Sequence, residues 1–370
     1  MALALSLLAV IGFIFIAALL ADGVRVLLAR RRHEAAARPL DLVVSERQES
    51  AGQLVRLTLA CARGGRLPAF SAGQHVLLQA PAGRQGKSVR RAYSLAAWTK
   101  TPRHYELGIK REAKGQVSAW AWENLKVGSR LALLPPRGDF ILAPQETGEL
   151  VLIAGGIGIT PLRAMLHATL AADRERRIVL FHAARSATEL LYHDEFQTLA
   201  ARPGNFSYRP LVSRPAADWI GESGRLDALR ILAALHTPTQ AAFYLCANGA
   251  LMDALHTGLL DAGIDAKRVH WEAFGVAMNN SASGQRIALE ADGRRHDIVS
   301  AGEPTLLATL EAHDLAPASE CRAGNCGQCC MRLVDGEVRW LMKSGIALAD
   351  GEILPCICTA TGDLRLAAPY

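Results

Sequence analysis

An uncharged apolar run opens the chain. Met1–Ala21 carries no charged side chain, and Asp22, Arg25 and then Arg30–Arg32 follow it. About 20 apolar residues can cross a hydrocarbon core of about 30 Å as a helix. A cleaved signal peptide is the alternative, but its basic residues precede an apolar core of only about 7–15 residues. The pattern predicts one uncleaved transmembrane helix over residues 1–32, in contact with membrane lipid. The arginines after it place the later domains on the cytoplasmic side of the inner membrane.

The pattern then changes to that of short strands. Alternating or clustered apolar segments, separated by Gly and Pro, occur at Leu40–Val44, Leu54–Leu59 and His75–Gln79. Such segments are typical of half-buried strands. They predict a small antiparallel β-barrel over residues 36–144.

From Leu150 the apolar segments are those of alternating strands and helices. Buried strands are expected at Leu150–Ala154, Ile178–His182, Phe206–Leu211 and Ala242–Cys246. A helix is expected from about Pro161, with Leu162, Met165, Leu166 and Leu170 on one face. This alternation predicts an α/β domain with a parallel sheet over residues 145–276. The polar stretch Asn279–Gly284 then marks a linker to a last domain over residues 284–370.

Composition agrees with a multidomain globular protein. The chain has 370 residues, of which 50% are hydrophobic and 21% charged, so it is not a disordered chain. The net charge of +6 divides into +3 for residues 1–32, +7 for residues 33–280 and −4 for residues 281–370. The opposite charges of the last two segments are those expected of two domains that dock on each other or exchange electrons. A solvated surface with randomly placed charges explains them equally well. We expect no nucleic-acid partner.

The cysteines are concentrated near the end of the chain. Six of the eight fall in the last 50 residues: Cys321, Cys326, Cys329, Cys330, Cys356 and Cys358. Clustering in a cytoplasmic protein indicates metal ligation, because disulfides are rare there. Cys321-x4-Cys326-x2-Cys329, with a further cysteine 27 residues on, is the plant-type [2Fe-2S] spacing. Gly324 and Gly327 let the backbone bend around such a cluster. The alternative is a zinc site built from Cys326-x2-Cys329 and Cys356-x-Cys358, which leaves Cys321 and both glycines without a role.

Two short motifs in the first domain suit a phosphate-bearing aromatic cofactor. In Arg91-Ala92-Tyr93-Ser94, the guanidinium can neutralise a phosphate, the ring can pack on an aromatic face and the hydroxyl can bond a ring nitrogen. Gly115-Gln116-Val117-Ser118 precedes a helical run, and we expect Ser118 to be its N-cap, beside N–H groups that could hold phosphates. An ordinary turn and helix cap is the alternative interpretation.

A glycine-rich turn opens the α/β domain. Gly155-Gly156-Ile157-Gly158-Ile159-Thr160-Pro161 lies between a buried strand and a helix. Its glycines let a pyrophosphate approach the backbone, Thr160 can cap the helix and Pro161 suits the first helical turn. The turn departs from G-x-G-x-x-G, so it is not that dinucleotide-binding motif.

Together with His270–Gly275 (HWEAFG) and residues 320–329 (ECRAGNCGQC), these motifs resemble the ferredoxin-NADP reductase superfamily. The order is that of the three-domain reductases serving oxygenases and desaturases. The resemblance implies a flavin-binding β-barrel, a nicotinamide-binding α/β domain and an α+β, β-grasp-like ferredoxin domain. It covers residues 38–370 and not the apolar start.

The resemblance also implies roles for individual residues. The expected flavin contacts are Arg91, Tyr93, Ser94, Gly115, Val117 and Ser118, with Ser94 near the reactive N5. The expected nicotinamide nucleotide contacts are Gly155, Gly156, Gly158, Thr160, Pro161, Arg185 and Ser186, with Cys246 beside the nicotinamide. The expected cluster ligands are Cys321, Cys326, Cys329 and Cys356, because Cys356 stands seven residues before Asp363; Cys330 and Cys358 are then small core residues. His75 is expected in a strand near the flavin rather than as a catalyst. The family's Cys-Gly-Pro is here Cys246-Ala247-Asn248.

The implied function is electron transfer. NADH gives up two electrons as a hydride, a flavin can hold two, one or none, and a [2Fe-2S] cluster takes one. We therefore expect hydride transfer to flavin N5, two single-electron steps to the cluster and delivery to an acceptor protein. The expected acceptor is a membrane desaturase or hydroxylase, or a Rieske-type oxygenase. FAD is favoured over FMN. NADH is the expected donor and NADPH stays open as the alternative, since Arg185 could hold a 2′-phosphate. Two alternatives are a reductase of quinone or ferric iron and a redox sensor without turnover.

Overall fold

The structure, a computed structural model, describes residues 38–368 except 52, 82–88, 113–114, 144–145, 275–282 and 292. The predicted anchor at residues 1–32 and most of the predicted linker lie outside these residues. Within the described ranges, no helix combines the length and the apolar character that a membrane crossing needs. Residues Asp41–Tyr370 form one compact unit that holds three domains.

The first domain has two antiparallel sheets. β1 (Leu40–Ser50), β2 (Leu54–Cys61), β5 (His104–Lys110) and β6 (Arg130–Leu133) form a sheet in the order β5-β2-β1-β6. β3 (His75–Ala80) pairs with β4 (Val89–Ser94), and α2 spans Gln116–Asn124. Single bridges, Leu95 to Leu107 and His75 to Arg137, connect the hairpin to the rest. In β2, Val55, Leu57 and Leu59 are fully buried at alternate positions, as expected of a strand with one solvated face.

The second domain contains a six-stranded parallel sheet in the order β10-β9-β8-β7-β11-β12. Its strands are β7 (Leu150–Gly155), β8 (Ile178–Ala184), β9 (Phe206–Val212), β10 (Glu222–Ser223), β11 (Ala242–Ala247) and β12 (Val269–Ala273). The chain runs from β7 outward on one side and returns to β11 on the other. β7 is therefore at the point where strand order reverses, where open α/β sheets bind ligands.

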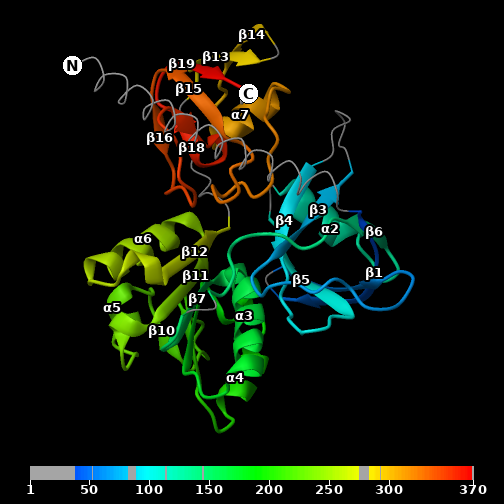
Figure 1. Cartoon of the computed structure of the whole chain (residues 1–370), viewed down its shortest axis with the longest axis vertical. Helices are drawn as coiled ribbons and strands as arrows, with labels where there is room; N and C mark the ends of the chain where they lie inside the picture. Colours follow the sequence, from blue (N-terminus) through cyan, green and yellow to red (C-terminus); the bar gives the residue numbers. More distant parts are fainter. Residues whose placement is uncertain are drawn as a thin grey trace, which may run out of the picture. The chain divides into compact units, whose positions relative to one another are not determined.

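Helices cover both faces of this sheet (Figure 1). Leu150 and Leu152 of β7 pack with α3 (Ile159–Ala172) and α4 (His193–Ala200). Val151 and Ile153, which point the other way, pack with α5 (Ala228–Leu232) and α6 (Gly249–Asp261). A strand buried on both faces must be apolar at every position, which explains the continuous apolar run in the sequence.

The third domain has a five-stranded mixed sheet in the order β14-β13-β19-β15-β17. Its strands are β13 (Arg286–Ala291), β14 (Arg294–Val299), β15 (Met331–Asp335), β17 (Glu352–Ile353) and β19 (Leu364–Ala367), with α7 at Leu306–Ala312. β16 (Val338–Trp340) pairs separately with β18 (Cys358–Ala360). Leu306 and Leu310 of α7 pack on the sheet. Three of the four expected cluster cysteines lie in the loop between α7 and β15.

Candidate active site and cluster-binding loop

The expected flavin residues lie on β4, beside β3. Ser94 is opposite His75 and only 2% exposed, and its hydroxyl has no hydrogen-bond partner within the described part of the chain. A buried hydroxyl without a partner is costly unless a ligand satisfies it. The position therefore fits a flavin ring nitrogen. Sequence reasoning placed His75 in a strand, and the structure does so; burial, then Arg137, lowers the His75 pKa to about 4, so the ring is neutral.

Arg91 lies near the guanidinium of Arg322, which is itself ion-paired with Glu311. Burial, and next the guanidinium of Arg322, lower the pKa of Arg91 to about 10, while Glu311 opposes this. Arg322 follows the first cluster cysteine, so the flavin strand and the cysteine loop share this environment. Nearby guanidinium groups suit a phosphate. Burial raises the pKa of Tyr93 and keeps its phenol neutral.

The turn before α2 differs from the prediction in one respect. α2 begins at Gln116 with Gly115 as N-cap, so the prediction that Ser118 is the N-cap is wrong. The Ser118 hydroxyl instead accepts from the Glu112 N–H at 3.1 Å and donates to the Gly115 carbonyl at 3.3 Å. A Cβ on Gly115 would lie 2.3 Å from the Ser118 Oγ, so the turn requires glycine. Val117 is buried beneath it. Because no side chain caps α2, its first N–H groups can receive a phosphate.

The glycine-rich loop leads directly into α3. α3 begins at Ile159, two residues before the predicted start, and its N-cap is Gly158. Thr160 is therefore not the cap: its hydroxyl donates to the Ile157 carbonyl at 3.1 Å, while Pro161 lies in the first turn as predicted. A Cβ on Gly158 would lie 2.0 Å from the Cys246 carbonyl oxygen.

The space next to Gly156 in this loop is open. Gly156 has φ +54°, which favours glycine, and no atom lies within 4 Å of where its Cβ would be. Gly155, at the end of β7, pairs in register with Ala183. The uncapped start of α3 and the open space fit a pyrophosphate.

The remaining nucleotide residues lie at the same edge of the sheet. Arg185, which is exposed, and Ser186 follow β8, the neighbour of β7. Cys246 is fully buried on β11, and burial raises the pKa of its thiol well above the ordinary value. The change from Cys-Gly-Pro has a local explanation, because the Asn248 side chain caps α6 by accepting from the Leu251 N–H at 3.1 Å.

The four expected cluster cysteines form two pairs. The Cys321 thiol is hydrogen-bonded to Cys326, and the Cys329 thiol to Cys356. The contact with Cys326 is the largest cause that lowers the pKa of Cys321, to about 6. The N–H groups of Ala323 and Asn325 also point at the Cys321 sulfur, at 3.5 and 3.3 Å. A [2Fe-2S] cluster needs two thiolates on each of two irons, which this pairing supplies.

The arrangement disfavours the zinc alternative. The zinc site would need Cys356 and Cys358 to face the same ion. Cys356 packs in the same apolar core as Cys329, whereas Cys358 packs in the separate core beneath α7. Cys330 is half-buried against the core of Cys329. Gly324 and Gly327 have positive φ angles, +73° and +70°, which explains why glycine occupies both positions.

Glu272 is a residue that the sequence analysis missed. It lies on β12 opposite Cys246, is 9% exposed, and its Oε2 has no hydrogen-bond partner among the described residues. Burial, and next the Cys321 sulfur, raise its pKa to about 8, so the carboxyl is protonated at neutral pH. The available signal was an acidic residue inside the apolar strand of HWEAFG.

Comparison with family models agrees with this order of sites. Residues 41–141 match an oxidoreductase FAD-binding domain, residues 152–257 an oxidoreductase NAD-binding domain, and residues 289–361 a 2Fe-2S iron-sulfur cluster binding domain. FAD, NAD(P)H and a [2Fe-2S] cluster are therefore the cofactors.

Related proteins span most of the chain. The glycine betaine monooxygenase reductase subunit of Pseudomonas aeruginosa is 29% identical over 318 residues, 80% of this chain and 86% of the relative. The ferredoxin reductase component of 3-ketosteroid-9-alpha-monooxygenase from Rhodococcus rhodochrous is 28% identical, over 73% of this chain and 78% of its own. The solved structure of phthalate dioxygenase reductase covers 90% of this chain and 98% of its own with a TM-score of 0.66, at 23% identity, and so shares the fold. The chain is an NAD(P)H-dependent flavin oxidoreductase of the ferredoxin-NADP reductase type, with FAD-binding, NAD-binding and [2Fe-2S] ferredoxin domains in that order along the sequence.

Proposed function

We propose that the chain is the reductase component of an oxygenase system, taking electrons from NADH and passing them to an oxygenase, hydroxylase or desaturase. The carrying observation is that the flavin strand, the nucleotide loop and the two cysteine pairs belong to one compact unit. The Arg137 Nη1 to Glu320 Oε1 contact, at 3.1 Å, joins the first domain to the residue before Cys321. The relatives named above, which are reductase components of monooxygenases, support the assignment.

The protein's own groups have distinct tasks in this scheme. When bound, FAD supplies the change from two-electron to one-electron transfer. Arg91 and the start of α2 would hold the flavin phosphates, Ser94 would donate a hydrogen bond to the flavin ring, and the 155–161 loop would hold the dinucleotide. Cys246 and Glu272, both buried and neutral, lie opposite each other on β11 and β12 and add no charge there. No acid–base pair is needed for hydride transfer.

Two finer points are part of the proposal. NADH is the favoured donor, although the exposed Arg185 could pair with the 2′-phosphate of NADPH. Residues 1–32 anchor the protein in the inner membrane with its domains in the cytoplasm, which the apolar run and its arginines support. Tethering would raise the effective concentration of a membrane-bound acceptor.

The test is reconstitution with defined acceptors. Full-length protein in vesicles and a variant lacking residues 1–32 are each supplied with NADH or NADPH and with a dye, a Rieske-type oxygenase, a membrane desaturase, a quinone or ferric citrate. We expect equal dye reduction by both proteins, preference for NADH, and coupling to one of the two protein acceptors. Loss of coupling on deletion is expected for a membrane acceptor. Efficient turnover with quinone or ferric citrate alone would refute the oxygenase assignment, and equal coupling without residues 1–32 would refute the anchor.

A further inference from the structure

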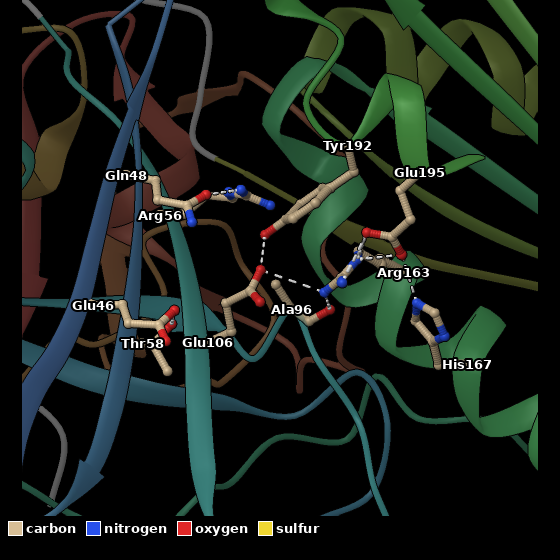
Figure 2. Close-up of polar contacts among 10 residues, drawn as sticks. All are labelled: Glu46, Gln48, Arg56, Thr58, Ala96, Glu106, Arg163, His167, Tyr192 and Glu195. Atoms are coloured by element: carbon tan, nitrogen blue, oxygen red, sulfur yellow. Dashed lines mark hydrogen bonds and ion pairs between the residues drawn. The ribbon is translucent and has the colours of Figure 1, made fainter. Parts of the chain in front are cut away.

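A polar network joins the flavin domain to the nucleotide domain (Figure 2). We call it the clamp: Glu106 on β5, Arg163 on α3, Tyr192 before α4, and Glu195 on α4. Each of these side chains is half-buried or buried. Ion pairs and hydrogen bonds out of water hold geometry better than exposed pairs, which are screened.

Arg163 is the centre of the clamp. Its Nε donates to both carboxylate oxygens of Glu195 at 2.9 Å, its Nη1 donates to the Ala96 carbonyl at 2.8 Å, and Nη1 lies 3.4 Å from the Glu106 Oε1. The side chain is only 12% exposed. A planar guanidinium can satisfy these acceptors together, whereas a lysine ammonium cannot match the fork.

Tyr192 contacts both Glu106 and the Arg163 guanidinium. Its hydroxyl donates to Glu106 Oε1 at 2.5 Å, and its ring lies between two guanidiniums, 4.3 Å from Arg163 and 5.3 Å from Arg56 on β2. The backbone of Tyr192 has φ +62°, an unfavourable value for a bulky residue. Strained residues persist only where their surroundings over-determine them.

The clamp connects the two halves of the reaction site through short stretches of chain. Arg163 follows Thr160 of the nucleotide loop by three residues, and Ala96 follows Ser94 of the flavin strand by two. Gly108, two residues beyond Glu106 on β5, faces the same elements: a Cβ there would lie 2.7 Å from Thr160 Cγ2 and 3.1 Å from Leu191 Cδ2. β5 thus touches both the glycine-rich nucleotide loop, at Thr160, and the segment before α4, at Leu191.

We propose that Arg163 is a positioning residue that holds the nucleotide loop in register with the flavin strand, so that the nicotinamide meets the flavin at hydride-transfer distance. The inference rests on the proposed function. In the step concerned, a hydride leaves the nicotinamide C4 for flavin N5 and solvent supplies a proton, so NADH becomes NAD⁺ and FAD becomes FADH₂. A misplacement of about 1 Å can cost about 100-fold in rate.

The experiment compares R163A, R163K and the control R209A in the holoenzyme. Arg209 makes an exposed ion pair with Glu222 within the same domain, so R209A removes a guanidinium without touching the clamp. Stopped-flow absorbance gives the flavin reduction rate at saturating NADH and, separately, the NADH affinity. Flavin content, flavin midpoint potential and hydrogen exchange of the 157–163 amides without nucleotide are measured on each protein. G108A is a second, independent variant. It adds a methyl group where β5 meets Thr160 and Leu191, and it removes no charge.

For R163A we expect reduction about 10- to 100-fold slower, faster hydrogen exchange in the loop, and unchanged flavin content and potential. R163K should recover only part of the rate, R209A should match the wild type, and G108A should be slow. If R163A fails to retain flavin, G108A and R163K decide the question. Wild-type reduction rates in R163A and G108A, or a loss traced wholly to NADH affinity, would overturn the inference and leave the proposed function standing. Failure of the wild type to reduce any oxygenase would refute the proposed function and leave the inference about Arg163 standing.

Discussion

At the scale of single residues, the chemistry was predictable and the local geometry less so. Cysteine spacing, RAYS and the glycine-rich turn were visible because each needs fixed residue types at fixed offsets. The caps were not: Ser118 and Thr160 look like N-caps, but their hydroxyls bond within the turn, and glycines occupy both cap positions. Side-chain propensity could not show this, because a ligand-binding helix start must stay uncapped.

Ser94 carries the first prediction. Because its buried hydroxyl has no partner in the described structure, Ser94→Ala should leave folding intact while removing a hydrogen bond to the flavin. We expect flavin reduction by NADH to slow about tenfold, which corresponds to about 1.4 kcal/mol. Stopped-flow absorbance measures the rate. Ser45→Ala, which removes an exposed hydroxyl from the same domain, is the control and should have no effect. A melting temperature that falls steeply in Ser94→Ala would contradict a ligand-facing role.

At the scale of elements, the sequence predicted where most strands lie but not which strands pair. The apolar runs located β1, β2, β3, β7, β8, β9 and β11, yet β1 extends to Ser50, beyond the predicted Val44. Gln48 and Glu49 are polar and exposed but still pair with β2, since one face of an antiparallel sheet can be solvated. The contacts of β5 with α3 could not be foreseen, because they join residues 57 positions apart.

The contact between α3 and α4 carries a pH prediction. Burial would raise the pKa of Glu195, but hydrogen bonds from His167 and Arg163 outweigh it and lower that pKa to about 2. A carboxyl with a depressed pKa stabilises the fold above its unfolded pKa of about 4.5, and this stabilisation is lost as the pH falls towards 2. The melting-temperature gap between wild type and Glu195→Gln should therefore be constant above about pH 5 and narrow below about pH 4.5. Glu123→Gln, at an exposed ion pair, should show little gap. A gap that is the same at pH 7 and pH 3 would contradict the assignment.

At the scale of the whole molecule, the order of domains was predictable from the motifs, but their contacts were not. Arg137 and Glu320 are 183 residues apart. Glu320 opens the cysteine motif 320–329, but Arg137 belongs to no motif. Their ion pair nevertheless connects the flavin domain to the loop that begins at Cys321. We expect it to hold the cluster loop in place for the one-electron step.

Charge exchange tests this contact. Glu320→Arg should slow cluster reduction by the reduced flavin about tenfold without slowing hydride transfer, because only the second step crosses the contact. The double variant R137E/E320R restores an opposite pair and should recover much of the rate. Rapid-mixing absorbance separates the two steps, and electron paramagnetic resonance checks that the cluster is intact. Equal rates in all three proteins would show that the pair does not matter for transfer.

The central claim is an electron path from NADH through FAD to a [2Fe-2S] cluster held by Cys321, Cys326, Cys329 and Cys356. Its most direct test is an anaerobic NADH titration of the holoenzyme, followed by optical and electron paramagnetic resonance spectra, on wild type, Cys326→Ser and Cys358→Ala. The path predicts flavin bleaching and a one-electron-reduced iron signal in wild type and in Cys358→Ala, and flavin bleaching without the native iron signal in Cys326→Ser. No iron signal in the wild type, or an unchanged signal in Cys326→Ser with normal iron content, would contradict it.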